Sequence, residues 1–145
     1  MQTGRRLVRL AAGMAFSASV AGGAAIGALA NDRDVTADEF DARTQGLTLY
    51  FDLEGSPYGA EQYMRNRQVR WQGAGGQCLE GYWYGEGSEI CFVYDNGRDG
   101  AQCWRVFDRG GVLFAQLRGV PLEDAISASK QDDKPLNCPG PDLGV

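Results

Sequence analysis

From Leu47 to Leu117 the sequence consists of short runs in which apolar and polar residues alternate, and glycine-rich turns separate the runs. An alternation of period two is that of a β-strand, whose successive side chains point to opposite faces. Strands separated by such short turns are typical of an antiparallel meander. We therefore expect a mostly β domain of about six to eight strands that forms a curled sheet or a small barrel.

Most strand boundaries follow from the turn residues, but two segments leave a choice. Residues 60–64 fit a strand, although Ser56-Pro57 before them is also a good helix start; we favour a strand. The segment Asp95–Gly100 resembles a calcium loop, yet Gly97 and Val106 occupy positions that need oxygen ligands, so a hairpin loop is preferred. The strands expected with less ambiguity are 47–53, 69–71, 77–84, 89–94, 102–107 and 112–117.

Both flanks of the sheet carry their own signals. Thr36 and Glu39 form a capping box, which predicts a short helix over residues 36–44 that places Phe40 against the sheet. After the last strand, residues 122–129 predict one or two helical turns, and 131–134 are a solvent-exposed charge run. The proline-containing segment 135–141 predicts a C-terminal strap that returns Cys138 to the sheet.

Alternation also assigns the two faces of the sheet. One face is mostly large and apolar and is the expected core: Leu79, Gly81, Trp83, Ile90, Phe92, Tyr94, Trp104, Val106, Leu113, Ala115 and Leu117. Trp71 is expected to join this core. The opposite face carries Cys78, Cys91 and Cys103, together with Tyr82, Tyr84 and Arg105.

Four cysteines in an exported chain indicate two disulfides. Pairing across the 95–100 loop sets Cys91 opposite Cys103, within disulfide reach, and leaves Cys78 to Cys138. Pairing Cys78 with Cys91 and Cys103 with Cys138 is the main alternative. A four-thiolate zinc site is less consistent with the sequence, because zinc ligands usually come in close pairs and these cysteines are widely spaced.

The first 30 residues have the features of a cleavable secretory signal. Three arginines precede an uncharged stretch that ends in Ala28-Leu29-Ala30, small residues that suit signal peptidase. A retained membrane anchor is the alternative, but the stretch is mostly Ala, Gly and Ser and would insert weakly. We therefore expect a signal peptide over 1–30, a single domain over 31–145, no stable membrane insertion after cleavage, and a periplasmic or secreted location.

The charge of the remaining chain restricts its partners. The signal removes three of the 14 basic residues and none of the 19 acids, which leaves 11 − 19 = −8. Such a charge argues against binding to nucleic acid or to anionic membranes. The chain has no histidine, which excludes triads that use histidine. We predict no cofactor and no metal.

Three functional hypotheses remain. Tyr82, Tyr84 and Arg105 could bind a peptide, protein or glycan of the cell envelope, which makes a non-enzymatic binding or structural module the first hypothesis; covering of this face by the N-terminal helix or the strap is the alternative. An inhibitor of a secreted hydrolase is the second, by analogy of fold alone. A carboxylate-dependent enzyme that uses Glu80 and Glu89 is the third.

Finally, the pattern Cys78-x2-Gly81-x-Trp83, Ile90-Cys91-Phe92-x-Tyr94, Cys103-Trp104 and Leu136-x-Cys138-x-Gly140-Pro141 resembles small exported proteins of proteobacteria. Those proteins are classed only as domains of unknown function. The resemblance implies an alphaproteobacterial-type periplasmic protein and carries no catalytic residues to transfer.

Overall fold

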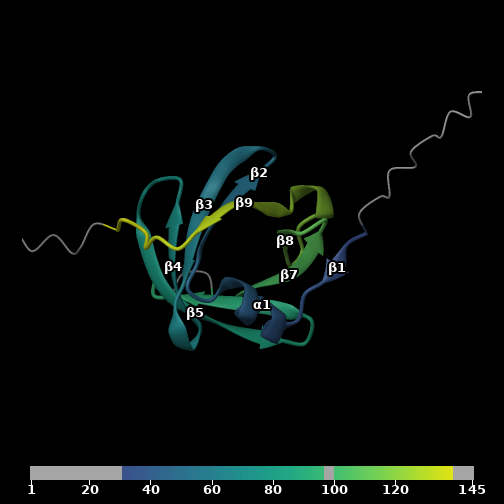
Figure 1. Ribbon diagram of the computed structural model, residues 1–145, viewed down its shortest axis with the longest axis horizontal. Coiled ribbons are helices and arrows are strands. Elements are labelled where there is room, and N and C mark those ends of the chain that lie inside the picture. The colour runs from purple at the N-terminus through teal and green to yellow at the C-terminus, as the bar shows by residue number, and fades with distance from the viewer. Residues whose placement is uncertain (1–30, 97–99, 139–145) are drawn as a thin grey trace, which may run out of the picture.

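The computed structural model describes residues 31–96 and 100–138, so the predicted signal lies outside the described residues. Eight strands follow one another as an antiparallel meander, and the last pairs with the first to close a barrel (Figure 1). A two-residue strand, β1 (Arg33–Asp34), pairs with Phe107 and Asp108 of β7, beyond the residues of β7 that pair with β6. The expectation of a mostly β small barrel is confirmed. The barrel strands are β2 (Thr48–Leu53), β3 (Ser56–Tyr63), β4 (Gln68–Gly73), β5 (Cys78–Glu86), β6 (Glu89–Tyr94), β7 (Gln102–Arg109), β8 (Val112–Leu117) and β9 (Ile126–Asp132).

The α-helix of the described residues, α1 (Ala37–Thr44), lies across one end of the barrel (Figure 1). Thr36 caps it, because its hydroxyl accepts a hydrogen bond from the Glu39 backbone N–H at 3.2 Å. Phe40 is buried, and its ring packs edge-on against Tyr63 and Trp83 with centroids 5.4 and 5.1 Å apart. Thr36 as the N-cap and the position of Phe40 are confirmed, whereas the Glu39 carboxylate binds Arg33.

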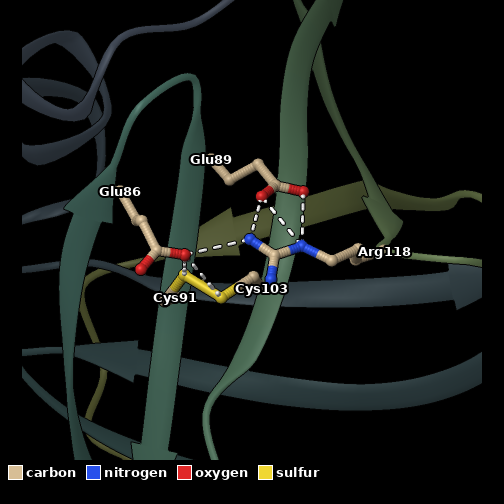
Figure 2. Close-up of a disulfide and its surroundings, with 5 residues drawn as sticks. All are labelled: Glu86, Glu89, Cys91, Cys103 and Arg118. Atoms are coloured by element: carbon tan, nitrogen blue, oxygen red, sulfur yellow. Dashed lines mark hydrogen bonds and ion pairs between the residues drawn. A yellow bond between two sulfur atoms is a disulfide. The ribbon is translucent and has the colours of Figure 1, made fainter.

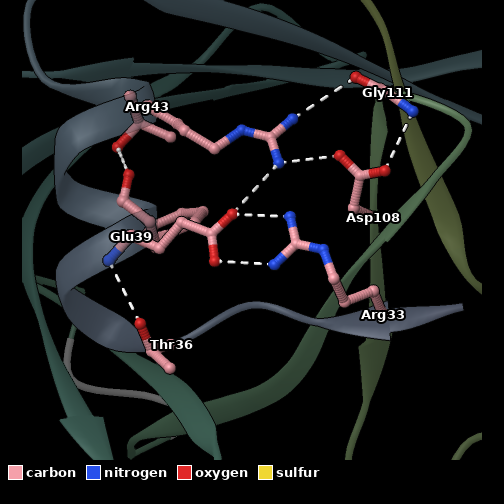
Figure 3. Close-up of polar contacts among 8 residues, drawn as sticks. Arg33, Thr36, Glu39, Arg43, Asp108 and Gly111 are labelled. Carbon is pink, nitrogen blue, oxygen red and sulfur yellow. Dashed lines mark hydrogen bonds and ion pairs between the residues drawn. The ribbon is translucent and has the colours of Figure 1, made fainter.

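An ion-pair network fastens α1 and β1 to the β7–β8 hairpin (Figure 3). Glu39 on the helix accepts two hydrogen bonds from the Arg33 guanidinium, at 2.9 and 2.7 Å. Arg43 on the same helix reaches Asp108 at 2.8 Å, and Asp108 in turn accepts a hydrogen bond from the Gly111 N–H at 2.9 Å. These partners lower the pKa values of Glu39 and Asp108: the Arg33 hydrogen bond acts most strongly on Glu39, the Gly111 hydrogen bond on Asp108.

The C-terminal part of the barrel differs from the sequence-based prediction. A single 3-10 turn, η2 (Leu122–Asp124), occupies part of the predicted helical region, and strand β9 then runs to Asp132. Residues 131–134 are exposed or half-buried, as a solvated charge run predicts, but Gln131 and Asp132 also belong to β9 and pair with β2. Main-chain pairing with both β2 and β8 and burial of Ile126 outweigh the low strand propensity of this polar stretch.

Strand β3 begins earlier than predicted. Glu54 and Gly55, both with positive φ (50° and 77°), make the whole turn after β2, so Ser56 and Pro57 already belong to the strand. Two consecutive positive φ values suit the tight hairpin turn that matches strand twist. The choice of strand over helix for residues 60–64 is confirmed as far as Tyr63. A second 3-10 turn, η1 (Arg65–Arg67), leads to β4.

Both predicted disulfides are confirmed. Cys91 and Cys103 lie directly opposite each other on β6 and β7, with Cα atoms 4.0 Å apart. Cys78 binds Cys138, with Cα atoms 5.8 Å apart, so the C-terminal strap is tethered to β5. Within the described residues, no helix combines the length and the hydropathy needed to cross a membrane.

Candidate functional site

The barrel encloses a cavity of about 240 Å³. Its walls come from every barrel strand and are mainly aromatic and aliphatic, and Phe40 of α1 also contributes. Among the lining residues Tyr58 and Asn96 are exposed, so the cavity meets solvent between the start of β3 and the β6–β7 connection. The side chains that give it its apolar character include Phe51, Trp71, Phe92, Trp104, Leu113 and Ile126.

A carboxyl group lies within this apolar wall. Glu61 on β3 is only 4% exposed, and the Tyr94 hydroxyl donates to its carboxyl group, with oxygens 2.9 and 3.1 Å away. In the described part of the chain no ion pair includes Glu61. Burial raises the pKa of Glu61 to about 8, and the Tyr94 hydrogen bond only partly opposes this. Burial, with the nearby Glu61 charge, also raises the pKa values of Tyr94 and Tyr63.

Two glycines make room for the rings beside this carboxyl group. A Cβ on Gly59 would lie 2.4 Å from the Trp71 ring, and a Cβ on Gly81 would lie 2.3 Å from the Val93 carbonyl oxygen and 2.9 Å from the Tyr94 ring. Glu61 is paired directly across from Trp71 in the β3–β4 register. The absence of side chains at Gly59 and Gly81 therefore lets Trp71 and Tyr94 lie inside the barrel, close to Glu61.

The charges of the cavity and of the outer surface are separated. Among the described residues that line the cavity, Glu61 is the only aspartate or glutamate, and none is a lysine or arginine. Several arginines on the outer surface are paired with acids, among them Arg70 with Glu80 at 2.6 Å and Arg109 with Asp32 at 2.7 Å. The cavity therefore has one ionisable carboxyl group with no basic side chain beside it among the lining residues described.

The three residues proposed from sequence as an outer binding patch are not all brought together. Tyr82 and Tyr84 are neighbours on the outside of β5, with ring centroids 6.5 Å apart, and Tyr82 is 48% exposed. Arg105 lies two strands away on β7, where it pairs with Asp34 at 2.6 Å and stacks over Phe107. The two tyrosines form one surface feature, whereas Arg105 helps to hold β1 against β7.

The proposed pair of catalytic carboxylates, Glu80 and Glu89, is not formed. Glu80 binds Arg70, whereas Glu89 binds Arg118 on the other side of β6. In the β5–β6 register Glu89 is opposite Glu86, which is six residues along β5 from Glu80. Glu80 and Glu89 therefore do not approach each other, because the hairpin register places them toward opposite ends of β5 and β6.

The Cys91–Cys103 disulfide lies beside an exposed ion-pair cluster (Figure 2). Arg118 bridges Glu86, at 3.0 Å, and Glu89, and this lowers the pKa of Glu89. A Glu86 carboxylate oxygen approaches the two sulfurs at 3.8 and 3.9 Å, but these are contacts, since a disulfide has no S–H to donate. Glu86, Cys91 and Cys103 are close enough to share a metal ion, yet both sulfurs are committed to the disulfide bond.

Sequence reasoning missed the cavity and its buried carboxyl group. Before residue 77 only Trp71 was assigned to the core face, although Gly59, Glu61 and Tyr63 share one face of β3 by simple alternation. The sequence signal that was available is the acid Glu61 two positions before the large aromatic residue Tyr63, which places both on the same face of the strand. The hairpin segment Asp95–Gly100 is described only in part, since residues 97–99 lie outside the described residues.

Comparisons with known proteins add no assignment: no family model matches the chain, and neither do any curated protein or solved structure.

Proposed function

We propose that this chain is a non-enzymatic binding module of the cell envelope and that it holds a small, mainly apolar molecule inside its barrel. The observation that carries the proposal is the cavity of about 240 Å³ with aromatic walls, an opening and a buried carboxyl group. Concave apolar sites with a few placed polar groups are the usual form of a small-molecule site, and barrel interiors are a preferred position for them.

The volume limits the size of the ligand. A cavity of about 150 Å³ is known to take benzene, so by proportion 240 Å³ takes roughly ten non-hydrogen atoms, about the size of propylbenzene. Two disulfides and the leader predicted from the sequence support a location outside the cytoplasm, where such a protein would carry or sequester its ligand.

The test is titration of the purified, oxidised protein with propylbenzene, followed by tryptophan fluorescence, because Trp71 and Trp104 line the cavity. We expect saturable binding in the micromolar to millimolar range, since only apolar contacts are gained. Ala115→Leu adds three carbons to the cavity wall and should abolish binding, whereas Tyr82→Ala, on the outer surface, should leave it unchanged. No saturable binding, or equal binding by the Ala115→Leu variant with unchanged circular dichroism, would refute the proposal.

A second candidate function uses the outer surface. The exposed Tyr82–Tyr84 pair supports binding of a peptide or glycan of the cell envelope, because tyrosines contribute strongly to such interfaces. In a pull-down from a periplasmic extract, the Tyr82→Ala/Tyr84→Ala double variant should lose partners that the wild type recovers. Equal recovery by both proteins would exclude this surface.

A further inference from the structure

The chemistry around Glu61 narrows the class of ligand, and this step rests on the proposed cavity function. We propose that the cavity selects a small organic cation, an amine with an apolar body, whose ammonium group is bound by the Glu61 carboxylate inside an aromatic enclosure. The body would lie against the apolar wall formed by Phe51, Phe92 and Trp104.

The first argument is charge complementarity. Glu61 is the acid among the described residues lining the cavity, and no lysine or arginine lines it with Glu61. An anionic ligand would find no basic side chain among the described lining residues to balance its charge. An ammonium group instead supplies the opposite charge that a buried carboxylate needs to be stable.

The second argument is the remaining hydrogen-bonding capacity of Glu61. A carboxylate has about four acceptor positions, whereas the Tyr94 hydroxyl has a single proton to donate. Acceptor positions therefore remain for the N–H groups of a bound ammonium, and charge-assisted hydrogen bonds of this kind are the strong ones.

The third argument is the aromatic surround. Trp71 lies directly across the β3–β4 ladder from Glu61. The rings of Tyr58 and Phe51 lie beside the Trp71 ring, with centroids 5.8 and 6.5 Å from it. Cations are attracted to the faces of such rings, most strongly to tryptophan, and more so where water is excluded. Glycine at positions 59 and 81 leaves room for this arrangement, because a Cβ at either position would collide with the neighbouring atoms.

Binding also has a proton balance that can be measured. The pKa of about 8 keeps Glu61 mostly protonated near pH 6.5 before the ligand binds. When the ammonium enters, the carboxyl O–H bond breaks, the electron pair stays on Glu61, and the proton passes to buffer. Binding of the amine should therefore release close to one proton, whereas binding of a neutral ligand should release none.

The experiment compares phenethylamine with propylbenzene, which has a methyl group where the amine has its ammonium. Calorimetric titrations of the purified protein at pH 6.5, in buffers of different ionisation enthalpy, give affinity and proton release together. We expect phenethylamine to bind at least about tenfold more tightly than propylbenzene and to release a proton. The Glu61→Gln variant should lose both the preference and the release but still bind propylbenzene, and Glu80→Gln, on the outer surface, should keep both.

The outcomes separate the two proposals. If neither compound binds, the cavity function itself is refuted. If propylbenzene binds as tightly as phenethylamine or more tightly, the cavity function stands and the preference for amines is overturned. Retention of the amine preference by Glu61→Gln also overturns it, and circular dichroism with propylbenzene binding confirms that the variant is folded.

Discussion

The buried Glu61 carboxyl group should make the stability of the protein depend on pH in a way that one substitution removes. In the folded protein its pKa is about 8, against an ordinary value of 4.5. Between these two values the folded state holds a proton that the unfolded chain has lost. The free energy of unfolding must therefore fall as pH rises through this window, since stability falls wherever the native state binds more protons.

The size of the effect follows from the two pKa values. The difference, 8 − 4.5 = 3.5, corresponds to about 5 kcal/mol, because each unit is worth about 1.4 kcal/mol. Well below pH 4.5 the Glu61 carboxyl group is protonated in both the folded and the unfolded state, and well above pH 8 it is ionised in both. The change in the free energy of unfolding therefore falls mainly between these two pH values. Glu61→Gln keeps the shape of the side chain but cannot ionise. Its stability relative to the wild type should therefore rise by about 4 kcal/mol from pH 4.5, where the unfolded carboxyl group is already half ionised, to pH 8.5.

The assay is urea unfolding of both proteins, with disulfides intact, at intervals from pH 4.5 to 8.5. The difference between the free energies of unfolding of variant and wild type cancels the contributions of acids with lowered pKa values, such as Asp108 and Glu89. Those contributions are lost as pH falls. The matched control is Glu80→Gln, an exposed acid paired with Arg70, which should change stability by less than about 1 kcal/mol at each pH. A difference between Glu61→Gln and wild type that stays constant or shrinks as pH rises would refute the reasoning.

Three further substitutions test the scaffold. Cys103→Ser opens the β6–β7 cross-link and should lower the free energy of unfolding by about 2–4 kcal/mol in urea; unchanged stability would argue against a structural disulfide. Gly81→Ala forces a Cβ toward the Val93 carbonyl oxygen and should cost about 1–3 kcal/mol and weaken binding of propylbenzene, whereas Gly75→Ala, where a Cβ meets nothing, should cost almost nothing. Thr36→Ala removes the cap of α1 and should cost about 1 kcal/mol by the same assay; an unchanged midpoint would show that the cap is not needed.

Much of the scaffold could be predicted from local patterns. The capping box of Thr36 and Glu39 depends only on adjacent residues, and the Cys91–Cys103 pair follows from a hairpin whose register its loop determines. Alternation placed Trp83 and Phe92 on the inner face for the same reason. In each case the physical cause lies within a single helix turn or a pair of neighbouring strands.

The remaining features depend on contacts between distant segments. Strand β9 is stabilised by pairing with β2, about 80 residues earlier in the chain, so its polar residues gave no local strand signal. The position of Glu61 inside the barrel depends on the closure of all eight strands, and its raised pKa depends on the resulting burial. Arg105 was assigned to a binding patch because its partner Asp34 lies in a strand of two residues that no pattern indicates.

The most direct test of a ligand site within the barrel is a crystal structure of the oxidised protein grown with propylbenzene. We expect density for one molecule between Trp71, Trp104 and Leu113, inside the barrel wall. Bound molecules found only on the outer surface, or an interior in which these side chains close on one another, would contradict the existence of this site.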